Sequence, residues 1–207
     1  MIVPENIERY AEEHTTPPDP LLAELEAETR TTLSLPEMLA GPVQGRFLEF
    51  LVYCLSAKRV LEIGTYSGYS ALAMAAGLPP DGRIDTCEID EERAEVARRY
   101  IARSPYAERI TVHVGPAIET IARLDGDFDF IFIDADKTGY IDYYEVVLPR
   151  LSERGLIAAD NTLSGGRAVD GTRPEIIAFN EHVKSDDRVT SVLLTLRDGV
   201  TLIRRRP

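Results

Sequence analysis

The sequence predicts an α/β protein with an open, mostly parallel sheet, helices on both faces and an antiparallel hairpin at the end. From Arg59 onward, short β-prone segments alternate with amphipathic helical segments, which is typical of parallel strands joined by crossover helices. The segment Phe128 to Ile133 is continuously apolar, as expected for a strand that is covered on both faces. Asp198 and Gly199 separate two further β-rich segments, which indicates a hairpin.

The first 57 residues are predicted to be helical and to lack strands. A helix over 19–32 is indicated by Asp19 as its N-cap and by Pro20 at its first position. A second helix over 43–55 is indicated by apolar residues at helical spacing. We therefore expect residues 1–57 to form a helical extension packed on a core of residues 58–207, within a single domain.

The core is predicted to contain five alternating strand–helix units followed by the hairpin. Turn and capping signals bound these units, for example Pro79-Pro80-Asp81-Gly82. The predicted strands span 59–63, 83–89, 109–114, 128–133, 155–159, 189–196 and 200–204. The predicted helices span 67–77, 91–103, 116–124, 139–151 and 172–185.

The composition indicates a folded protein and excludes some functions. The chain has 207 residues, of which 44% are hydrophobic, and Gly and Pro are present at ordinary levels (14 and 13). The formal net charge of −12 argues against nucleic acid and against an anionic membrane surface as partners, because both require a cationic surface. No apolar stretch approaches 18 residues, so no membrane span is expected.

The cysteines and the N-terminus indicate a cytoplasmic protein. Cys54 and Cys87 lie in apolar stretches, so we expect buried free thiols in a reducing compartment. The first residues lack a basic segment followed by an apolar one, so no signal peptide is expected.

Residues at the ends of the first two core strands indicate a nucleoside site. Gly64 and Gly68 would allow a tight turn and a close backbone approach to a ligand. Their G-x-x-x-G spacing is neither the dinucleotide G-x-G-x-x-G nor a phosphate-binding P-loop. Glu88, 24 residues after Gly64, ends the second strand, where a carboxylate suits two ribose hydroxyls.

The charges near this site distinguish between nucleoside ligands. Glu62 lies within an apolar strand, where an ionised carboxylate is costly unless a cation pairs with it. An amine on the ligand would supply that cation, whereas phosphate is disfavoured because the site lacks nearby Lys or Arg. A nucleoside with a cationic amino-acid part fits best, which describes S-adenosylmethionine better than NAD.

A second group of polar residues follows the fourth and fifth core strands. Asp134 ends one strand, and Asp160 and Asn161 end the next, so their side chains should meet at one edge of the sheet. Oxygen ligands without Cys or His suit Mg²⁺, Mn²⁺ or Ca²⁺ and not zinc. The alternative is that these are ordinary acidic residues at strand ends.

Four segments in this order resemble the cation-dependent O-methyltransferases of the caffeoyl-CoA and catechol type: E-I-G-T-Y-S-G-Y-S, C-E-I-D, D-F-I-F-I-D-A-D-K and A-D-N-T-L. The resemblance covers roughly Met38 to Arg204 and includes the helical segment M-L-A-G-P-V-Q-G-R-F-L. It implies a Rossmann-like class I methyltransferase fold with a seven-stranded sheet. Members of this family are commonly homodimers, so we expect a homodimer.

The resemblance also implies roles for individual residues. Asp134, Asp160 and Asn161 match the metal ligands, and Lys137 matches the general base, with Asp134 beside it in the catalytic set. A divalent cation nearby would lower the pKa of Lys137. The residues implied to bind S-adenosylmethionine are Ala40, Glu62, Gly64, Thr65, Tyr66, Ser67, Gly68, Ser70, Glu88, Ile89, Pro116, Ala117, Asp134 and Asp136.

Departures from the family pattern concern the acceptor. Ala40 and Gln44 stand where the family usually has Thr and Glu, and Ser164 and Gly165 stand where it often has Asn and a bulky aromatic residue. The loop 164–172 is Gly-rich and polar, which suits a mobile lid over the acceptor. We therefore expect a small catechol-like acceptor and not a CoA ester.

The sequence thus predicts an S-adenosylmethionine-dependent and divalent-metal-dependent O-methyltransferase that acts on an aromatic molecule with vicinal hydroxyls. One alternative is a cofactor-binding protein of the same fold that is not catalytic and serves regulation or assembly. Another is an NAD-dependent oxidoreductase, against which the missing third glycine and the acidic pocket argue.

Overall fold

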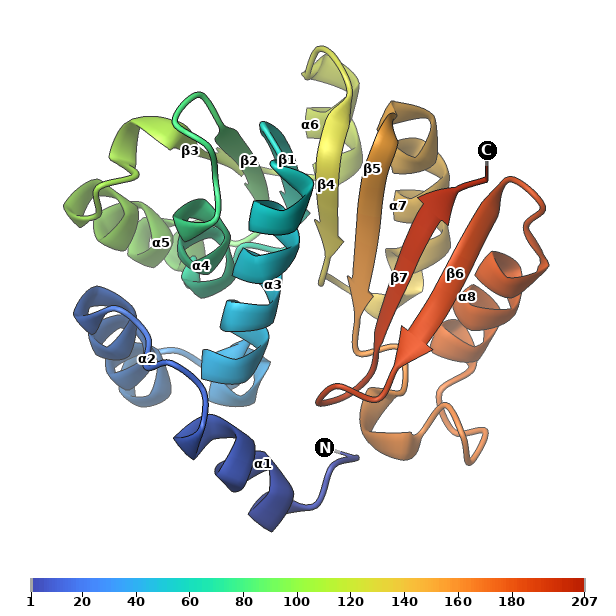
Figure 1. The fold of residues 1–207 in the computed structure, drawn as a ribbon, viewed down its shortest axis with the longest axis horizontal. Coiled ribbons are helices and arrows are strands. Elements are labelled where there is room, and N and C mark those ends of the chain that lie inside the picture. The colour runs from blue at the N-terminus through green and yellow to red at the C-terminus, as the bar shows by residue number, and fades with distance from the viewer. Residues whose placement is uncertain (1, 207) are drawn as a thin grey trace.

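The computed structural model describes residues 2–206 and has one seven-stranded sheet of order β3-β2-β1-β4-β5-β7-β6 (Figure 1). Strands β1 to β5 are parallel, and β7 pairs antiparallel with both β5 and β6. The strands are β1 (Arg59–Ile63), β2 (Arg83–Glu88), β3 (Ile110–Val114), β4 (Phe128–Ile133), β5 (Leu151–Asp160), β6 (Val189–Leu194) and β7 (Val200–Arg205). The predicted fold class is confirmed.

Eight α-helices in the described part of the chain accompany the sheet. They are α1 (Glu5–Glu13), α2 (Pro20–Thr32), α3 (Gly41–Leu55), α4 (Tyr69–Ala76), α5 (Glu91–Arg103), α6 (Ala117–Arg123), α7 (Tyr140–Val147) and α8 (Pro174–Ser185). Figure 1 shows α3, α4 and α5 on one face of the sheet and α6, α7 and α8 on the other. Leu48, Tyr69 and Tyr100 belong to the hydrophobic core on the first face, and Tyr144 and Phe179 to the core on the second.

The sheet order places the ligand edge between β1 and β4. The chain runs outward from β1 through β2 to β3, and then returns to β4 on the other side of β1. In open α/β sheets of this kind, ligands bind beyond the carboxyl ends of the strands where the order reverses. The loops after Ile63 and Ile133 meet at that point, because these two residues are partners in the β1–β4 register.

The N-terminal helices α1 and α2 pack on the helices that cover the first face of the sheet. Leu25 on α2 is fully buried, and Glu24 and Glu28 on the same helix form ion pairs with Arg103 and Arg99 on α5. No helix within residues 2–206 is long and apolar enough to cross a membrane.

Three local predictions differ from the structure. Strand β5 begins at Leu151 and not at Gly155. Its first half was not predicted because Ser152, Glu153 and Arg154 are polar and show no strand pattern. Helix α7 ends at Val147, and a 3₁₀ turn that contains Pro149 follows it. Cys54 was expected to be buried but is exposed on α3, whereas Cys87 is buried and free as expected.

Candidate functional site

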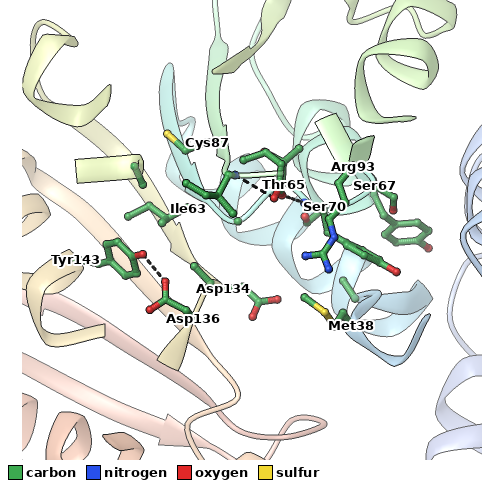
Figure 2. Close-up of a pocket in the computed structure, with 18 of the residues that line it drawn as sticks. Met38, Ile63, Thr65, Ser67, Ser70, Cys87, Arg93, Asp134, Asp136 and Tyr143 are labelled. Atoms are coloured by element: carbon green, nitrogen blue, oxygen red, sulfur yellow. Dashed lines mark hydrogen bonds between the residues drawn. The ribbon is translucent and has the colours of Figure 1, made fainter. Parts of the chain in front are cut away.

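A cavity of about 440 Å³ lies at the carboxyl ends of β1, β2 and β4 (Figure 2). Its walls come from the loops after β1, β2, β3 and β4 and from the segment that precedes α3. The structure brings most of the predicted cofactor residues together here: Ala40, Gly64, Thr65, Tyr66, Ser67, Ser70, Glu88, Ile89, Pro116, Ala117, Asp134 and Asp136. Their role in binding a cofactor stays a prediction.

Gly64 is required by the close approach of two chain segments. It adopts a φ of +101°, and a Cβ atom placed on it would lie 2.0 Å from the carbonyl oxygen of Asp134. Any side chain would therefore push the loop after β1 away from the loop after β4. Glycine at this position is what allows one cavity to be lined from both strands.

Glu88 is held in place by the backbone around it. Its Oε2 accepts a hydrogen bond from the Tyr66 N–H (2.7 Å), and its Oε1 accepts from the N–H groups of Ile89 and Asp90 (both 3.0 Å). A carboxylate has about four acceptor positions, so Oε2 keeps one for a ligand. A fixed carboxylate at the end of β2 is suited to accept from a ribose hydroxyl.

Glu62 and Gly68, which the resemblance also implies for the cofactor, lie outside the cavity wall. Glu62 is fully buried beneath it and accepts a hydrogen bond from Thr86 Oγ1 (2.5 Å), which in turn contacts Thr65 Oγ1. Burial raises the pKa of Glu62 to about 8. Gly68 precedes α4 and packs closely against Ala97.

A second cavity of about 450 Å³ shares Met38, Asp134, Ala135 and Asp136 with the first. Lys137, Asp160 and Asn161 also line it, so the predicted metal and base residues meet in one place. The two cavities are therefore neighbours with a common wall. A ligand in each would have its reactive end next to the other.

Lys137 is fixed by two neighbours. Its Nζ donates to Asp134 Oδ1 (2.9 Å) and to the Tyr140 hydroxyl (2.6 Å), and that hydroxyl donates to the carbonyl oxygen of Asp160 (2.9 Å). Burial acts to lower the pKa of Lys137, but Asp134 and Tyr140 outweigh it and hold the pKa above its ordinary value. The lowering expected beside a divalent cation has the opposite direction and stays a prediction.

Asp160 has one carboxylate oxygen without a hydrogen bond. The side chain is only 2% exposed, and its Oδ2 accepts from Gln44 Nε2 (2.6 Å). Its Oδ1 is buried and has no hydrogen-bond partner among the described residues. Burial, and after it the Asp134 carboxylate, raise the pKa of Asp160 to about 7. A buried oxygen of this kind, with Asp134 and Asn161 nearby, fits a hard divalent cation.

Gln44 links Asp160 to the hairpin between β6 and β7. Its Oε1 accepts from Arg197 Nη1 (2.9 Å), which fixes the amide so that its NH₂ group points to Asp160. Arg197 also donates to the carbonyl oxygens of Leu39 and Ala40. This hairpin thus holds the N-terminal segment against the site.

Several residues at the site were not predicted. Met38 and Arg93 line the first cavity, as Figure 2 shows, and Arg197 lines the second. The expectation that no Lys or Arg lies near the nucleoside site is therefore wrong, because Arg93 reaches the cavity from α5. Tyr140 anchors Lys137, and its position three residues after the base was the only available signal. Met38 and Arg93 lie within a few residues of the predicted Ala40 and Glu88, but their residue types carry no signal for a ligand, and Arg197 comes from a hairpin far away in the sequence.

Residues 12–206 match the family described as O-methyltransferase. The chain is 34% identical over 209 residues to a probable caffeoyl-CoA O-methyltransferase 2 of Dictyostelium discoideum, an alignment that covers 96% of this chain and 90% of the relative.

Solved structures of methyltransferases are also similar to this chain. The SAH-bound methyltransferase PaMTH1 of Podospora anserina superposes with a TM-score of 0.93 at 29% identity, covering 100% of this chain and 99% of that one. An O-methyltransferase of Bacillus cereus in complex with SAH superposes with a TM-score of 0.89 at 31% identity, covering 97% of each chain.

Proposed function

Because the chain belongs to the O-methyltransferase family, we propose that it transfers the methyl group of S-adenosylmethionine to a hydroxyl of a small catechol-like molecule, with a divalent cation bound. The observation that carries this proposal is the pair of neighbouring cavities with Asp134, Ala135 and Asp136 in their common wall. One cavity has in Glu88 a fixed carboxylate that suits a ribose hydroxyl. The other is lined by Lys137 and by the oxygen-bearing side chains of Asp134, Asp160 and Asn161.

In this proposal the first cavity holds the cofactor, and the SAH bound by two of the similar structures supports a cofactor of this kind. S-adenosylmethionine supplies an activated methyl group. Glu88 orients the ribose, and Gly64 allows close approach of the backbone. Asp136 contributes charge near the sulfonium, and its own position is fixed by the Tyr143 hydroxyl (2.5 Å) and the Gly139 N–H (3.0 Å).

The second cavity holds the acceptor, whose hydroxyl proton is received by Lys137 Nζ. Asp134, Asp160 and Asn161 would hold Mg²⁺, or Mn²⁺ or Ca²⁺. Such a cation supplies orientation of the two acceptor oxygens and charge stabilisation of the oxyanion. The Asp134 carboxylate favours the ammonium form of Lys137, so the base role requires that this carboxylate be engaged elsewhere.

We also propose that the protein is a cytoplasmic homodimer. Phe50 and Tyr53 support the dimer, because both lie on α3 and are 59% and 72% exposed. Sedimentation velocity tests this part of the proposal, with a dimer expected at micromolar concentration and a monomer contradicting it.

The enzymatic proposal is tested with purified protein, labelled S-adenosylmethionine, Mg²⁺ and a panel of catechols. We expect methyl transfer that stops after exhaustive chelation and returns with Mg²⁺. Asp160→Ala should lower kcat/KM by at least about a hundredfold, because one buried ligand is removed. Asp187→Ala removes a carboxylate that is 99% exposed and serves as the matched control.

Two outcomes would contradict parts of this proposal. Equal turnover after chelation would exclude the metal role. Calorimetry that detects binding of S-adenosylhomocysteine, with no transfer to any acceptor, would favour the non-catalytic alternative.

A further inference from the structure

The second cavity, which the proposed function assigns to the acceptor, is lined almost entirely by polar and charged residues. Among the described residues in its wall, only Met38 and Ala135 are apolar, and none is aromatic. Ser164, where the family often has a larger residue, begins a 3₁₀ turn within the loop that follows β5. An acceptor ring in this cavity would therefore find no aromatic side chain to stack on, so other contacts must select it.

The wall carries four acidic and four basic side chains. The acidic ones are Asp134, Asp136, Asp160 and Asp198, and the basic ones are Lys137, Arg167, Arg173 and Arg197. The chain as a whole has 35 acidic and 23 basic residues, so this cavity is richer in cations than the rest of the protein. A divalent cation held by Asp134 and Asp160 would leave the cavity with an excess of positive charge.

Two of the four cations are engaged within the protein. Lys137 is paired with Asp134 at 2.9 Å, and Arg197 donates through its Nη1 to Gln44 and to backbone carbonyls of the N-terminal segment. The charges of Lys137 and Arg197 stabilise the site, and these two residues contribute little charge to the binding of a ligand.

The other two, Arg167 and Arg173, have donors to spare. Arg167 donates through Nε to the Ser164 carbonyl oxygen (3.0 Å) and weakly through Nη2 to the Ser164 hydroxyl (3.4 Å). The Nε of Arg173 is buried and makes no hydrogen bond within the described residues; it lies 3.8 Å from Oε2 of Glu175, which is likewise buried without a hydrogen bond. A contact of 3.8 Å is too long for a hydrogen bond, so this buried N–H of a cation remains unsatisfied, and a ligand oxygen at hydrogen-bond distance would satisfy it.

We infer that the acceptor carries a carboxylate in addition to its vicinal hydroxyls, and that Arg167 and Arg173 bind this carboxylate. The inference rests on the proposed function. The hydroxyls lie toward Lys137, Asp134 and Asp160, and the acid group lies toward the loop between β5 and α8. A planar guanidinium matches a carboxylate in geometry as well as in charge. The same chemistry would bind a phosphate, such as that of a CoA ester, and the test separates the two.

The test compares kcat/KM for 3,4-dihydroxybenzoate and 3,4-dihydroxybenzamide, which have the same hydroxyls but differ in charge. The wild type should prefer the acid by about tenfold to a hundredfold, the effect of one charged hydrogen-bonded contact. Arg173→Met and Arg167→Met should each reduce this ratio, and Arg173→Lys should retain part of it. Because the intrinsic reactivity of each acceptor is the same for every variant, the change in ratio reports the contact.

Arg204→Met is the matched control, since Arg204 is exposed and lies on β7 outside both cavity walls. It should keep the wild-type ratio. The melting temperature and the Kd for S-adenosylhomocysteine, measured for every variant, separate loss of the contact from loss of the fold.

Three results would overturn the inference. Transfer without a preference for the acid, or a preference that Arg173→Met leaves intact, overturns the inference and spares the proposed function. A much higher kcat/KM for caffeoyl-CoA than for free caffeate, if Arg173→Met abolishes that difference, would show that the bound anion is a phosphate. Absence of transfer to every acceptor overturns the proposed function and the inference with it.

Discussion

At the scale of single residues, Gly64 determines how close the two sides of the first cavity lie. Its φ of +101° and the Asp134 carbonyl oxygen together exclude any Cβ. We expect Gly64→Ala to lower the free energy of unfolding by about 2–4 kcal/mol, from backbone strain and overpacking together. Urea unfolding measures this change.

Gly126→Ala is the matched control for that substitution. Gly126 also has a positive φ (+74°), but nothing lies within 4 Å of the position of its Cβ. It therefore carries the backbone strain without the clash. Equal losses for the two variants would show that the approach to Asp134 is not what requires glycine.

Glu62 gives the stability of the protein a dependence on pH. Its pKa is about 8 in the folded protein, because of burial, and 4.5 as a reference for the unfolded chain. Between these values the unfolded state loses the proton that the folded state keeps, so the free energy of unfolding falls as pH rises from about 4.5 to 8 and then levels off. The slope from this residue is at most about 1.4 kcal/mol per pH unit.

Glu62→Gln keeps the shape of the side chain and removes the titration. In urea unfolding between pH 5 and pH 8.5, we expect the stability of the wild type to fall relative to that of Glu62→Gln. Parallel curves for the two proteins would contradict a raised pKa at this position.

At the scale of elements, the docking of α2 on α5 depends on charge. Glu28 accepts hydrogen bonds from Arg99 and from the Tyr100 hydroxyl, and these lower its pKa to about 2. The stabilisation is present above pH 4.5, the ordinary pKa of Glu, and is lost as pH falls toward 2. Hydrogen exchange in α2 should therefore accelerate at pH 3 relative to pH 6, after correction for the intrinsic rates.

The variant Glu28→Gln should show the faster exchange already at pH 6. Glu26→Gln is the control on the same helix, because Glu26 pairs with Arg30 of α2 itself and not with α5. Exchange that is unchanged in Glu28→Gln would mean that apolar contacts such as those of Leu25 alone hold the helix.

Most of the elements could be predicted from the sequence because their patterns are local. The apolar run of β4 and the Asp90 cap of α5 mark their own boundaries. The first half of β5 could not be predicted, since its polar residues 152–154 carry no strand pattern and lie at a register shift between the Phe128–Leu151 and Phe130–Leu156 pairs with β4. Helix α1 has no buried residue, so its sequence shows no core-facing apolar stripe from which its bounds could be predicted.

The residues of the site also differ in whether the sequence could predict their positions. Asp134, Asp160 and Lys137 follow strands directly, so their meeting could be predicted from sheet topology. Gln44 donates to Asp160 from 116 positions earlier in the chain, and Arg197, which donates to Gln44, lies 153 positions after Gln44. Only the folded structure brings these three residues together.

At the scale of the whole molecule, binding of the cofactor should stabilise the entire fold. The first cavity is built from four loops of the sheet and the N-terminal segment, and unfolding destroys it. At a concentration of S-adenosylhomocysteine about 100 times its Kd, we expect a gain of about 2.7 kcal/mol in the free energy of unfolding. The melting temperature should rise by several degrees, and a thermal shift assay measures it.

NAD at the same excess serves as the control ligand for that shift. The described wall of the first cavity contains carboxylates and no phosphate-binding loop, so we expect NAD to bind weakly. An equal shift with NAD would reopen the oxidoreductase alternative.

The wall that the two cavities share has a consequence for the order of events in turnover. Met38 belongs to both cavities and lies in the N-terminal segment that Arg197 holds in place. A displacement of this segment that admits or releases one ligand also reshapes the space for the other. The affinities are then linked reciprocally, so that the acceptor strengthens cofactor binding by the same factor by which the cofactor strengthens acceptor binding.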